Sequence, residues 1–254
     1  MRSQLDRADP ARRADTLIVL LPGAYDTPED LVKQGFVSAL RERHLPVDLL
    51  LVDAHTGYYT AREIVERLRS EIIVPARAQG YTRIWLAGIS LGGYGSLLLA
   101  HAHAEMIDGL FIMAPFLGRR DLPAAIKQAG GIAVWDGQWP DADAHDLELW
   151  RWLRGYVDTK ENAPTLPRFA WSAAPIPGDP REDAFCFGAA RQQKSHPPLY
   201  LGYGDTDRFA LSHRLLAAAL PPERVFVTPG GHEWAPWLRL WQRFLDLHPW
   251  ESPG

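Results

Sequence analysis

One short segment constrains the fold of this chain more than any other: a serine between two glycines, at the junction of an apolar run and a helix-like run. The segment is Gly88-Ile89-Ser90-Leu91-Gly92, which follows apolar residues 83–87 and precedes leucine-rich residues 96–100. A G-x-S-x-G turn holds its serine in a strained backbone conformation, and the glycines let strand and helix approach closely. The sequence therefore predicts a strand, a sharp turn and a helix.

The position of Ser90 at the apex of this turn makes it a candidate nucleophile. A helix that starts there points backbone N–H groups and the positive end of its dipole toward an oxyanion beside the serine hydroxyl. Glycine-rich turns also serve close packing alone. Because both flanking elements match the pattern that the motif requires, we favour the nucleophile over a purely structural turn.

The rest of the chain alternates short apolar runs with longer amphipathic ones, which is typical of a mostly parallel sheet with helices on both faces. Pro75 predicts a kink or an early end in the second of the expected helices. The fold class is therefore α/β, with about six core strands in one domain spanning residues 1–254. The expected strands are 16–21, 47–52, 83–88, 110–114, 199–203 and 224–228, and the expected helices include 28–43, 61–79, 91–104 and 234–247.

Residues 116–197 interrupt the alternation. They are rich in Pro, Gly and Trp and contain no run that resembles a buried strand. A stretch this long should carry helices of its own, such as one around 146–155, and we interpret it as an inserted lid or cap. Its tryptophans either line an apolar acyl pocket or simply pack the insertion onto the sheet, and both roles stay open. They are Trp135, Trp139, Trp150, Trp152 and Trp171.

A serine nucleophile needs a general base and a group that orients the base. His232 lies in a Gly-Gly-His loop between an apolar strand and the last helix, at the edge where open α/β sheets build their sites. The acid should follow a strand between Ser90 and His232, and both Asp205 and Asp207 do so. We prefer Asp207, which lies deeper in the loop, and expect the other carboxylate to turn the backbone.

An oxyanion requires two donors. The first is the N–H of Leu91, directly after the nucleophile, and the second usually comes from the loop after the first central strand, here residues 21–26. Because Gly23 permits a close approach, we expect the Ala24 N–H, with the N–H or hydroxyl of Tyr25 as the alternative. An ordinary turn is the competing interpretation, since Pro-Gly is a frequent turn pair.

The substrate pocket is expected to include His55 and Tyr58, which follow another central strand, together with Trp135 and Trp139. We expect no metal, because Asp53 and His55 lack further ligands at a recognisable spacing. We also expect no cofactor, since the glycine-rich stretches lack the Lys-Ser/Thr of a P-loop and the third glycine of a dinucleotide-binding turn.

Composition limits the classes of partner that the protein is expected to bind. The formal net charge is -4, and Lys and Arg are scattered, so nothing attracts nucleic acid or a membrane surface. The N-terminus lacks the apolar core of a signal peptide, and no apolar run approaches the ~18 residues of a membrane span. Cys186 is the only cysteine, which excludes an intramolecular disulfide. We expect a cytoplasmic protein that acts on a small molecule, and its oligomeric state is not indicated.

Taken together, Gly88-x-Ser90-x-Gly92, an aspartate after a later strand and His232 before the last helix resemble the α/β-hydrolase fold and its Ser-Asp-His enzymes. The resemblance covers nearly all of the chain from Thr16 onward and places the insertion where this family commonly carries a cap. The chain departs from the family in having Pro22-Gly23 where His-Gly is usual, and in lacking a sequence for the first antiparallel hairpin.

The resemblance implies acyl transfer to water. Ser90 would attack the carbonyl and form an acyl-enzyme intermediate, His232 would take and return the proton, and Asp207 would hold the imidazole. Esters of small to medium acyl chains are the favoured substrates, with thioesters or amides as the near alternative. A non-catalytic module of the same fold, which binds a ligand or a partner, is the alternative from another class.

Overall fold

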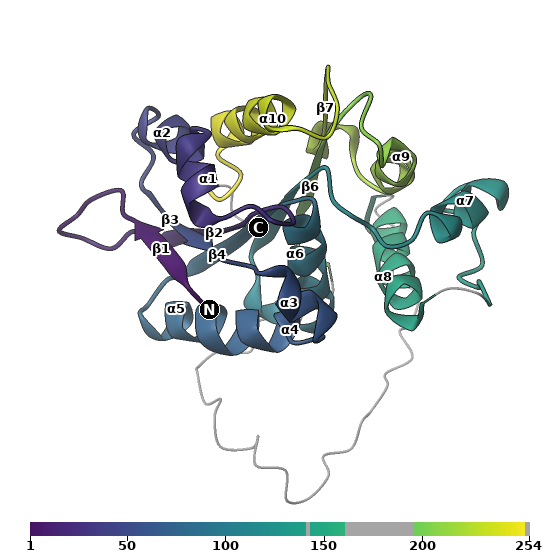
Figure 1. Ribbon diagram of the computed structural model, residues 1–254, viewed down its shortest axis with the longest axis horizontal. Coiled ribbons are helices and arrows are strands. Elements are labelled where there is room, and N and C mark those ends of the chain that lie inside the picture. Colours follow the sequence, from purple (N-terminus) through teal and green to yellow (C-terminus); the bar gives the residue numbers. More distant parts are fainter. Residues whose placement is uncertain (141–142, 161–195, 252–254) are drawn as a thin grey trace, which may run out of the picture.

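The computed structural model describes all residues except 141–142, 161–195 and 252–254, and its centre is one sheet with helices on both faces (Figure 1). The strand order is β1-β3-β2-β4-β5-β6-β7, and every neighbouring pair is parallel except β1 and β3. The α/β class expected from the alternation is confirmed. The strands are β1 (Ser3–Asp6), β2 (Thr16–Leu21), β3 (Val47–Val52), β4 (Arg83–Ile89), β5 (Gly109–Met113), β6 (Leu199–Gly204) and β7 (Val225–Thr228).

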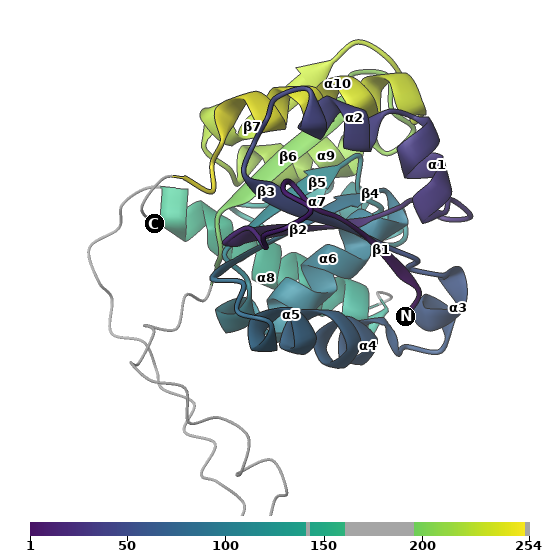
Figure 2. The same ribbon diagram turned by 90° about the vertical axis from the view of Figure 1, so that its left-hand side faces the viewer.

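Two helical layers enclose the sheet (Figure 2). Successive strand residues alternate between two cores, with Leu17 and Val19 in one and Ile18 and Leu20 in the other, so the strands read as continuous apolar runs. One layer contains α1 (Pro28–Lys33), α2 (Phe36–Arg41) and α10 (Trp234–Leu247). The other contains α4 (Ile64–Arg67), α5 (Val74–Ala78), α6 (Leu91–Ala102), α7 (Asp121–Gln128), α8 (Ala144–Lys160) and α9 (Ala210–Ala218).

The seventh strand corrects the expectation that no antiparallel strand precedes Thr16. β1 pairs with the outer edge of β3, with Leu5 opposite Leu50. Its sequence, Ser-Gln-Leu-Asp, is short and mostly exposed, so it lacks the apolar pattern by which strands are recognised. An edge strand of this kind is held by the hydrogen bonds that β3 offers.

Two expected helices are divided. Residues 28–43 form α1 and α2, separated at Gly35, whose φ of 90° breaks the first helix. Of residues 61–79, only 64–78 are helical, and a π-helical segment, η1 (Leu68–Ile73), stands between α4 and α5. Pro75 lacks an N–H, and its ring would clash with the carbonyl four residues earlier, which the wider turns before it relieve.

The insertion between β5 and β6 holds α7, α8 and no strand in the part that the structure describes. Trp150 and Trp135 are buried in the core, and their indole N–H groups donate to the backbone oxygens of Leu117 (3.0 Å) and Gln138 (3.1 Å). These contacts give both rings a packing role. Trp171 and Cys186 lie outside the described residues, and the extent of the lid over 116–197 stays a prediction.

A buried carboxylate ties the segment after β1 to the sheet. Asp48 in β3 is fully buried and accepts hydrogen bonds from the backbone N–H groups of Ala8 (3.0 Å) and Ala14 (3.1 Å) and from the hydroxyl of Tyr81 (2.7 Å). Burial, together with this carboxylate, raises the pKa of Tyr81. The tyrosine therefore remains a neutral donor to Asp48.

We expect Asp48→Asn to lower the free energy of unfolding by about 2 kcal/mol, because an amide nitrogen accepts no hydrogen bond and leaves a buried donor unsatisfied. Tyr81→Phe removes only one of the three donors and should cost about 1 kcal/mol. Urea unfolding followed by circular dichroism measures both. A variant Asp48→Asn as stable as the parent protein would contradict this account.

Candidate active site

Ser90 occupies the single residue between β4 and α6, with φ 50° and ψ −110°. This conformation is strained for a residue with a side chain. A Cβ atom at Gly88 would lie 2.4 Å from the backbone oxygen of Gly92, and a Cβ at Gly92 would lie 2.4 Å from those of Leu21 and Pro22. Both positions therefore require glycine, because the backbone segments around the serine are in direct contact there.

The side chain of His232 connects Ser90 with Asp207. Its Nε2 lies 2.9 Å from the Oγ of Ser90, and its Nδ1 lies 2.8 Å from Oδ2 of Asp207. The three residues follow β4, β6 and β7, so parallel strands bring them to the same edge of the sheet. This is the hydrogen-bonded chain through which an imidazole can accept a proton from a serine hydroxyl.

Asp205 makes its side-chain hydrogen bond elsewhere. Its Oδ1 accepts from the backbone N–H of Gly230 at 3.0 Å, and its own N–H donates to the oxygen of Thr228. The structure thus brings Asp207, and not Asp205, to the imidazole. The side chain of Asp205 thus holds the backbone of a neighbouring loop, as was expected for the second carboxylate.

The carboxyl group of Asp207 is held in its ionised form. Burial alone would raise its pKa, but hydrogen bonds from His232 and from the N–H of Phe209 (2.7 Å) outweigh burial and leave the pKa below its ordinary value. An ionised carboxylate only accepts hydrogen bonds, so Nδ1 of His232 carries a hydrogen. Nε2 is then free to accept the proton of Ser90.

Two aromatic rings enclose the imidazole, and sequence analysis did not assign either to the site. The rings of Phe209 and Trp237 meet that of His232 edge to face, at centroid distances of 5.2 and 5.0 Å. Trp237 lies on the apolar stripe of α10, where its spacing indicates only a core residue. Phe209 follows Asp207 by two residues, and no local pattern sets it apart.

The candidate oxyanion donors flank Ser90. Within the described part of the chain, the N–H groups of Ala24 and Leu91 donate to no protein acceptor, and Leu91 is the first residue of α6, where no intrahelical acceptor exists. A Cβ built on Gly23 would lie 3.8 Å from that of Ser90, so this loop lies against the serine. The Tyr25 side chain is 91% exposed. The roles of Leu91, Ala24 and Tyr25 stay predictions.

Asp26, on the same loop, is an acidic neighbour of the site that sequence analysis did not single out. A Cβ on Gly23 would lie 2.6 Å from its Oδ2. Burial and the nearby carboxylate of Asp30 raise the pKa of Asp26, while His232 opposes this shift. The β2 side of the site therefore carries an acidic group.

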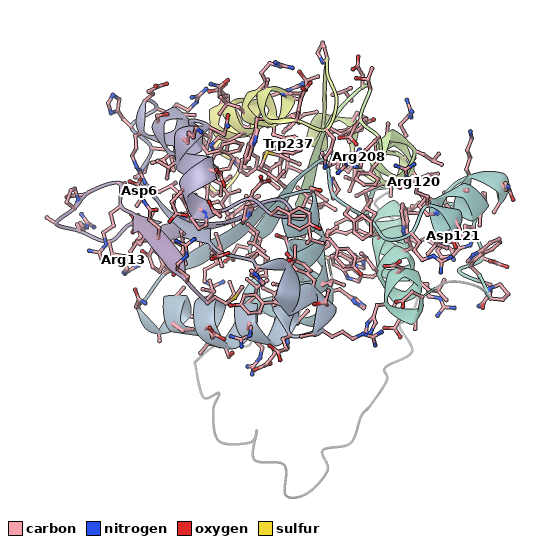
Figure 3. All side chains as sticks on the ribbon, viewed as in Figure 1. Asp6, Arg13, Arg120, Asp121, Arg208 and Trp237 are labelled. Atoms are coloured by element: carbon pink, nitrogen blue, oxygen red, sulfur yellow. The ribbon has the colours of Figure 1, made fainter. Side chains whose placement is uncertain are left out.

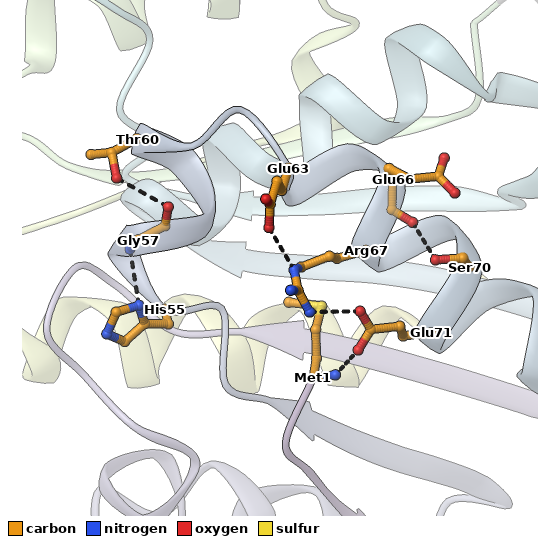
Figure 4. A network of polar contacts seen from close by, with 9 residues as sticks. All are labelled: Met1, His55, Gly57, Thr60, Glu63, Glu66, Arg67, Ser70 and Glu71. Atoms are coloured by element: carbon orange, nitrogen blue, oxygen red, sulfur yellow. Dashed lines mark hydrogen bonds and ion pairs between the residues drawn. The ribbon is translucent and has the colours of Figure 1, made fainter.

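The expected pocket residues on the β3 side have local structural contacts (Figure 4). Nδ1 of His55 accepts the N–H of Gly57 at 2.9 Å and so caps α3 (Thr56–Thr60). The ring of Tyr58 lies 4.6 Å from the guanidinium carbon of Arg67, which also bridges two glutamates of the same helical segment. That His55, Tyr58, Trp135 and Trp139 line a substrate pocket stays a prediction.

A cavity of about 610 Å³ lies between α4, α6 and the start of α8. It adjoins the nucleophile turn through Tyr94, which lines it and whose backbone N–H donates to the oxygen of Ser90 at 3.1 Å. The hydroxyl of Tyr94 donates to Asp146, also in the lining. This space is large enough for a small acyl group.

His213 is a buried histidine directly behind the site. The N–H at its Nε2 donates to the oxygen of Pro115 at 2.9 Å, and within the described part of the chain its Nδ1 has no partner. Burial lowers the pKa of His213 to about 4, although the charge of Asp207 opposes the shift. The ring is therefore neutral in the folded protein at neutral pH.

Comparison with known proteins places the chain in a class of enzymes. A sequence model described as "Alpha/beta hydrolase family" matches residues 18–247. The chain thus belongs to the alpha/beta hydrolase family, as its sequence motifs imply. No functionally curated protein gives a significant match.

Solved structures similar to this chain share its fold at low sequence identity. Est1E from Butyrivibrio proteoclasticus has a TM-score of 0.56 and 17% identity, over 98% of this chain and 93% of that one. A ferulic acid esterase has a TM-score of 0.54 and 16% identity, over 93% and 86%. An S-formylglutathione hydrolase from Staphylococcus aureus has a TM-score of 0.54 and 15% identity, over 92% and 80%.

Among the described residues, no helix is both long and apolar enough to cross a membrane. Nor do these residues contain a cluster of three or more His, Cys, Asp or Glu side chains arranged to hold a metal ion.

We expect Gly92→Ala to destabilise the protein by several kcal/mol, because its methyl group would overlap two backbone oxygens that no rotamer change can move. Gly231→Ala is the matched control, since a Cβ there has no neighbour closer than 3.9 Å. Thermal and urea unfolding compare the two variants. Equal stabilities would show that the turn does not need a glycine at position 92.

The buried His213 predicts a pH dependence of stability. The unfolded chain protonates this histidine near its ordinary pKa, and the folded protein only near 4, so stability is lost as pH falls between the two values. The slope contributed is about 1.4 kcal/mol per pH unit. His213→Gln keeps a donor for Pro115. The free energy of unfolding of this variant, measured with urea at each pH, should depend less on pH between these values. Exposed His145→Gln is the control, and an unchanged slope in His213→Gln would refute the assignment.

Proposed function

We propose that this protein is a serine hydrolase that cleaves carboxylic esters of small to medium acyl chains through Ser90, Asp207 and His232. The observation that carries the proposal is the unbroken chain of hydrogen bonds from Asp207 through His232 to the Oγ of Ser90. Membership of the alpha/beta hydrolase family supports the same reaction class.

In the proposed acylation step, Oγ of Ser90 attacks the carbonyl carbon while Nε2 of His232 takes the hydroxyl proton. Backbone N–H groups of Leu91 and Ala24 stabilise the oxyanion. When the tetrahedral intermediate collapses, the bond to the leaving group breaks and His232 gives its proton to the departing oxygen. Asp207 stabilises the imidazolium that exists between these transfers.

Deacylation repeats the sequence with water in place of the serine. His232 takes a proton from the water, whose oxygen attacks the acyl carbon, and then returns a proton to Oγ of Ser90 as the acid is released. No cofactor enters either step.

Esters are preferred among acyl substrates because similar folds include a ferulic acid esterase and an S-formylglutathione hydrolase, names that belong to those proteins. The second name keeps thioesters open as the near alternative, and amides use the same triad. A binding module that does not catalyse is disfavoured, because a binder does not need a base with its orienting acid. We also propose that the protein is cytoplasmic.

We expect Ser90→Ala to reduce kcat for p-nitrophenyl esters by about 10,000-fold or more, and Asp207→Asn by about 10,000-fold, with the fold retained in circular dichroism. Turnover across a series of acyl lengths gives the preferred chain. A fluorophosphonate should label the parent protein and fail to label Ser90→Ala. The control Ser70→Ala, at an exposed serine of η1, should keep both activity and labelling.

Two outcomes would count against the proposal. Labelling of Ser90→Ala at another serine would exclude Ser90 as the nucleophile. A parent protein that neither hydrolyses any ester of the series nor reacts with the fluorophosphonate would favour the binding module.

A further inference from the structure

Two arginine side chains lie against one aromatic ring next to the candidate catalytic residues. The ring of Phe209, which meets His232 edge to face, lies 5.0 Å from the guanidinium carbon of Arg208 and 5.5 Å from that of Arg120. Arg208 comes from the loop after β6, and Arg120 directly precedes α7. Figure 3 places the two arginines near each other, between α10 and α7.

Neither guanidinium is neutralised within the described part of the chain. Arg120 and Arg208 are exposed and take part in no ion pair or side-chain hydrogen bond there, whereas Arg119 pairs with Asp121 at 2.6 Å. An arginine over an aromatic face keeps the N–H groups at the edge of its planar fork available for further acceptors. Two sets of unused N–H donors therefore flank the ring of Phe209, which itself meets the imidazole of His232.

Three carboxylates of the neighbouring segments accept hydrogen bonds from other groups. Asp207 accepts from His232 and from the N–H of Phe209, and Asp205 accepts from Gly230. Asp146 accepts from the hydroxyl of Tyr94 and the N–H of Arg119. None of these carboxylates forms an ion pair with Arg120 or Arg208, so among the described residues both guanidinium groups are exposed cations without an anionic partner.

A second carboxyl group near the site, that of Asp26, lies on the other side of the nucleophile from the two arginines. Asp26 follows β2, and Arg208 follows β6, and these strands are on opposite sides of β4, which leads to Ser90. An anion bound near Asp26 would be repelled, and one bound over Phe209 would be attracted. The charged groups thus differ along the sheet edge: the carboxyl group of Asp26 lies on the β2 side, and the two guanidinium groups lie on the β6 side.

We propose that Arg120, Arg208 and the ring of Phe209 form a subsite for a carboxylate or phosphate on the leaving-group half of the substrate. This inference rests on the proposed function, because the leaving oxygen must lie next to His232 to receive its proton. Paired acceptor oxygens of either anion fit the guanidinium fork, and Phe209 packs against the apolar part that joins the anion to the ester. The preferred substrate is an ester of an anionic alcohol or phenol.

The test compares leaving groups with one acyl group: 4-carboxyphenyl acetate and 4-acetoxyphenyl phosphate against neutral 4-carbamoylphenyl acetate. We expect kcat/KM to favour an anionic ester, and the ratio to the neutral ester to fall by about tenfold or more in Arg120→Ala/Arg208→Ala. Salt should reduce the ratio in the parent protein. Whichever anion shows the larger ratio identifies the group recognised.

Arg243→Ala is the matched control, since Arg243 lies over the ring of Phe226 at 4.6 Å and is exposed in the same way. It should leave the ratio unchanged. p-Nitrophenyl hemisuccinate against p-nitrophenyl butyrate places the charge on the acyl half. A ratio that depends on the two arginines only in this second pair would overturn the assignment to the leaving group, and equal ratios in all variants would overturn the subsite.

A binding measurement separates the subsite from catalysis. By calorimetry, 4-acetamidobenzoate should bind the parent protein more tightly than neutral 4-acetamidobenzamide, and Arg120→Ala/Arg208→Ala should remove the difference. If no ester is hydrolysed but this difference is found, the proposed function and the leaving-group assignment fail, and only anion binding by the two arginines stands. If esters are hydrolysed and neither ratio nor binding responds to the arginines, the subsite fails and the hydrolase stands.

Discussion

The backbone of α6 touches the backbone of β4 and of the loop after β2, and the position of Ser90 depends on this approach. No side chain fits at Gly88 or Gly92, because even a methyl group would overlap carbonyl oxygens. The strained serine between them is held by hydrogen bonds from its N–H to Met113 and from the N–H of Phe116 to its oxygen. β5 and the residues after it therefore stabilise a conformation that the serine would not adopt alone, while β6 and β7 lead to Asp207 and His232.

Charge is distributed unevenly around this serine. An ionised, buried Asp207 supports the imidazole from behind, while His213 stays neutral because of its burial, so it adds no positive charge that would compete for this carboxylate. Asp26 and the two arginines over Phe209 then face the site from opposite sides of β4. An arrangement of this kind favours substrates by the position of their charge as much as by their shape.

The sequence predicted those elements whose stability comes from a regular apolar pattern. β2, β3 and α10 have the predicted bounds, because their residues are buried on both faces or along one stripe. β1 escaped prediction because pairing with β3, and not burial, holds it. The nucleophile turn and the histidine loop could be located from glycines and strand order, but Asp205 and Asp207 share one loop, and only their hydrogen bonds distinguish them. Phe209 and Trp237 approach His232 from separate elements, which no local pattern records.

Two hydrogen bonds hold the segment that directly follows β5. Pro115 accepts the hydrogen bond of His213, and Phe116 donates to Ser90, so two consecutive residues are pinned between α9 and the serine. At the far end, the hydroxyl of Tyr156 in α8 donates to the oxygen of Pro197, just before β6. The chain is thus held by hydrogen bonds where it leaves β5 and where it returns to β6. We expect substitutions on the exposed surface of α7 and α8 to leave the backbone of Ser90 in place.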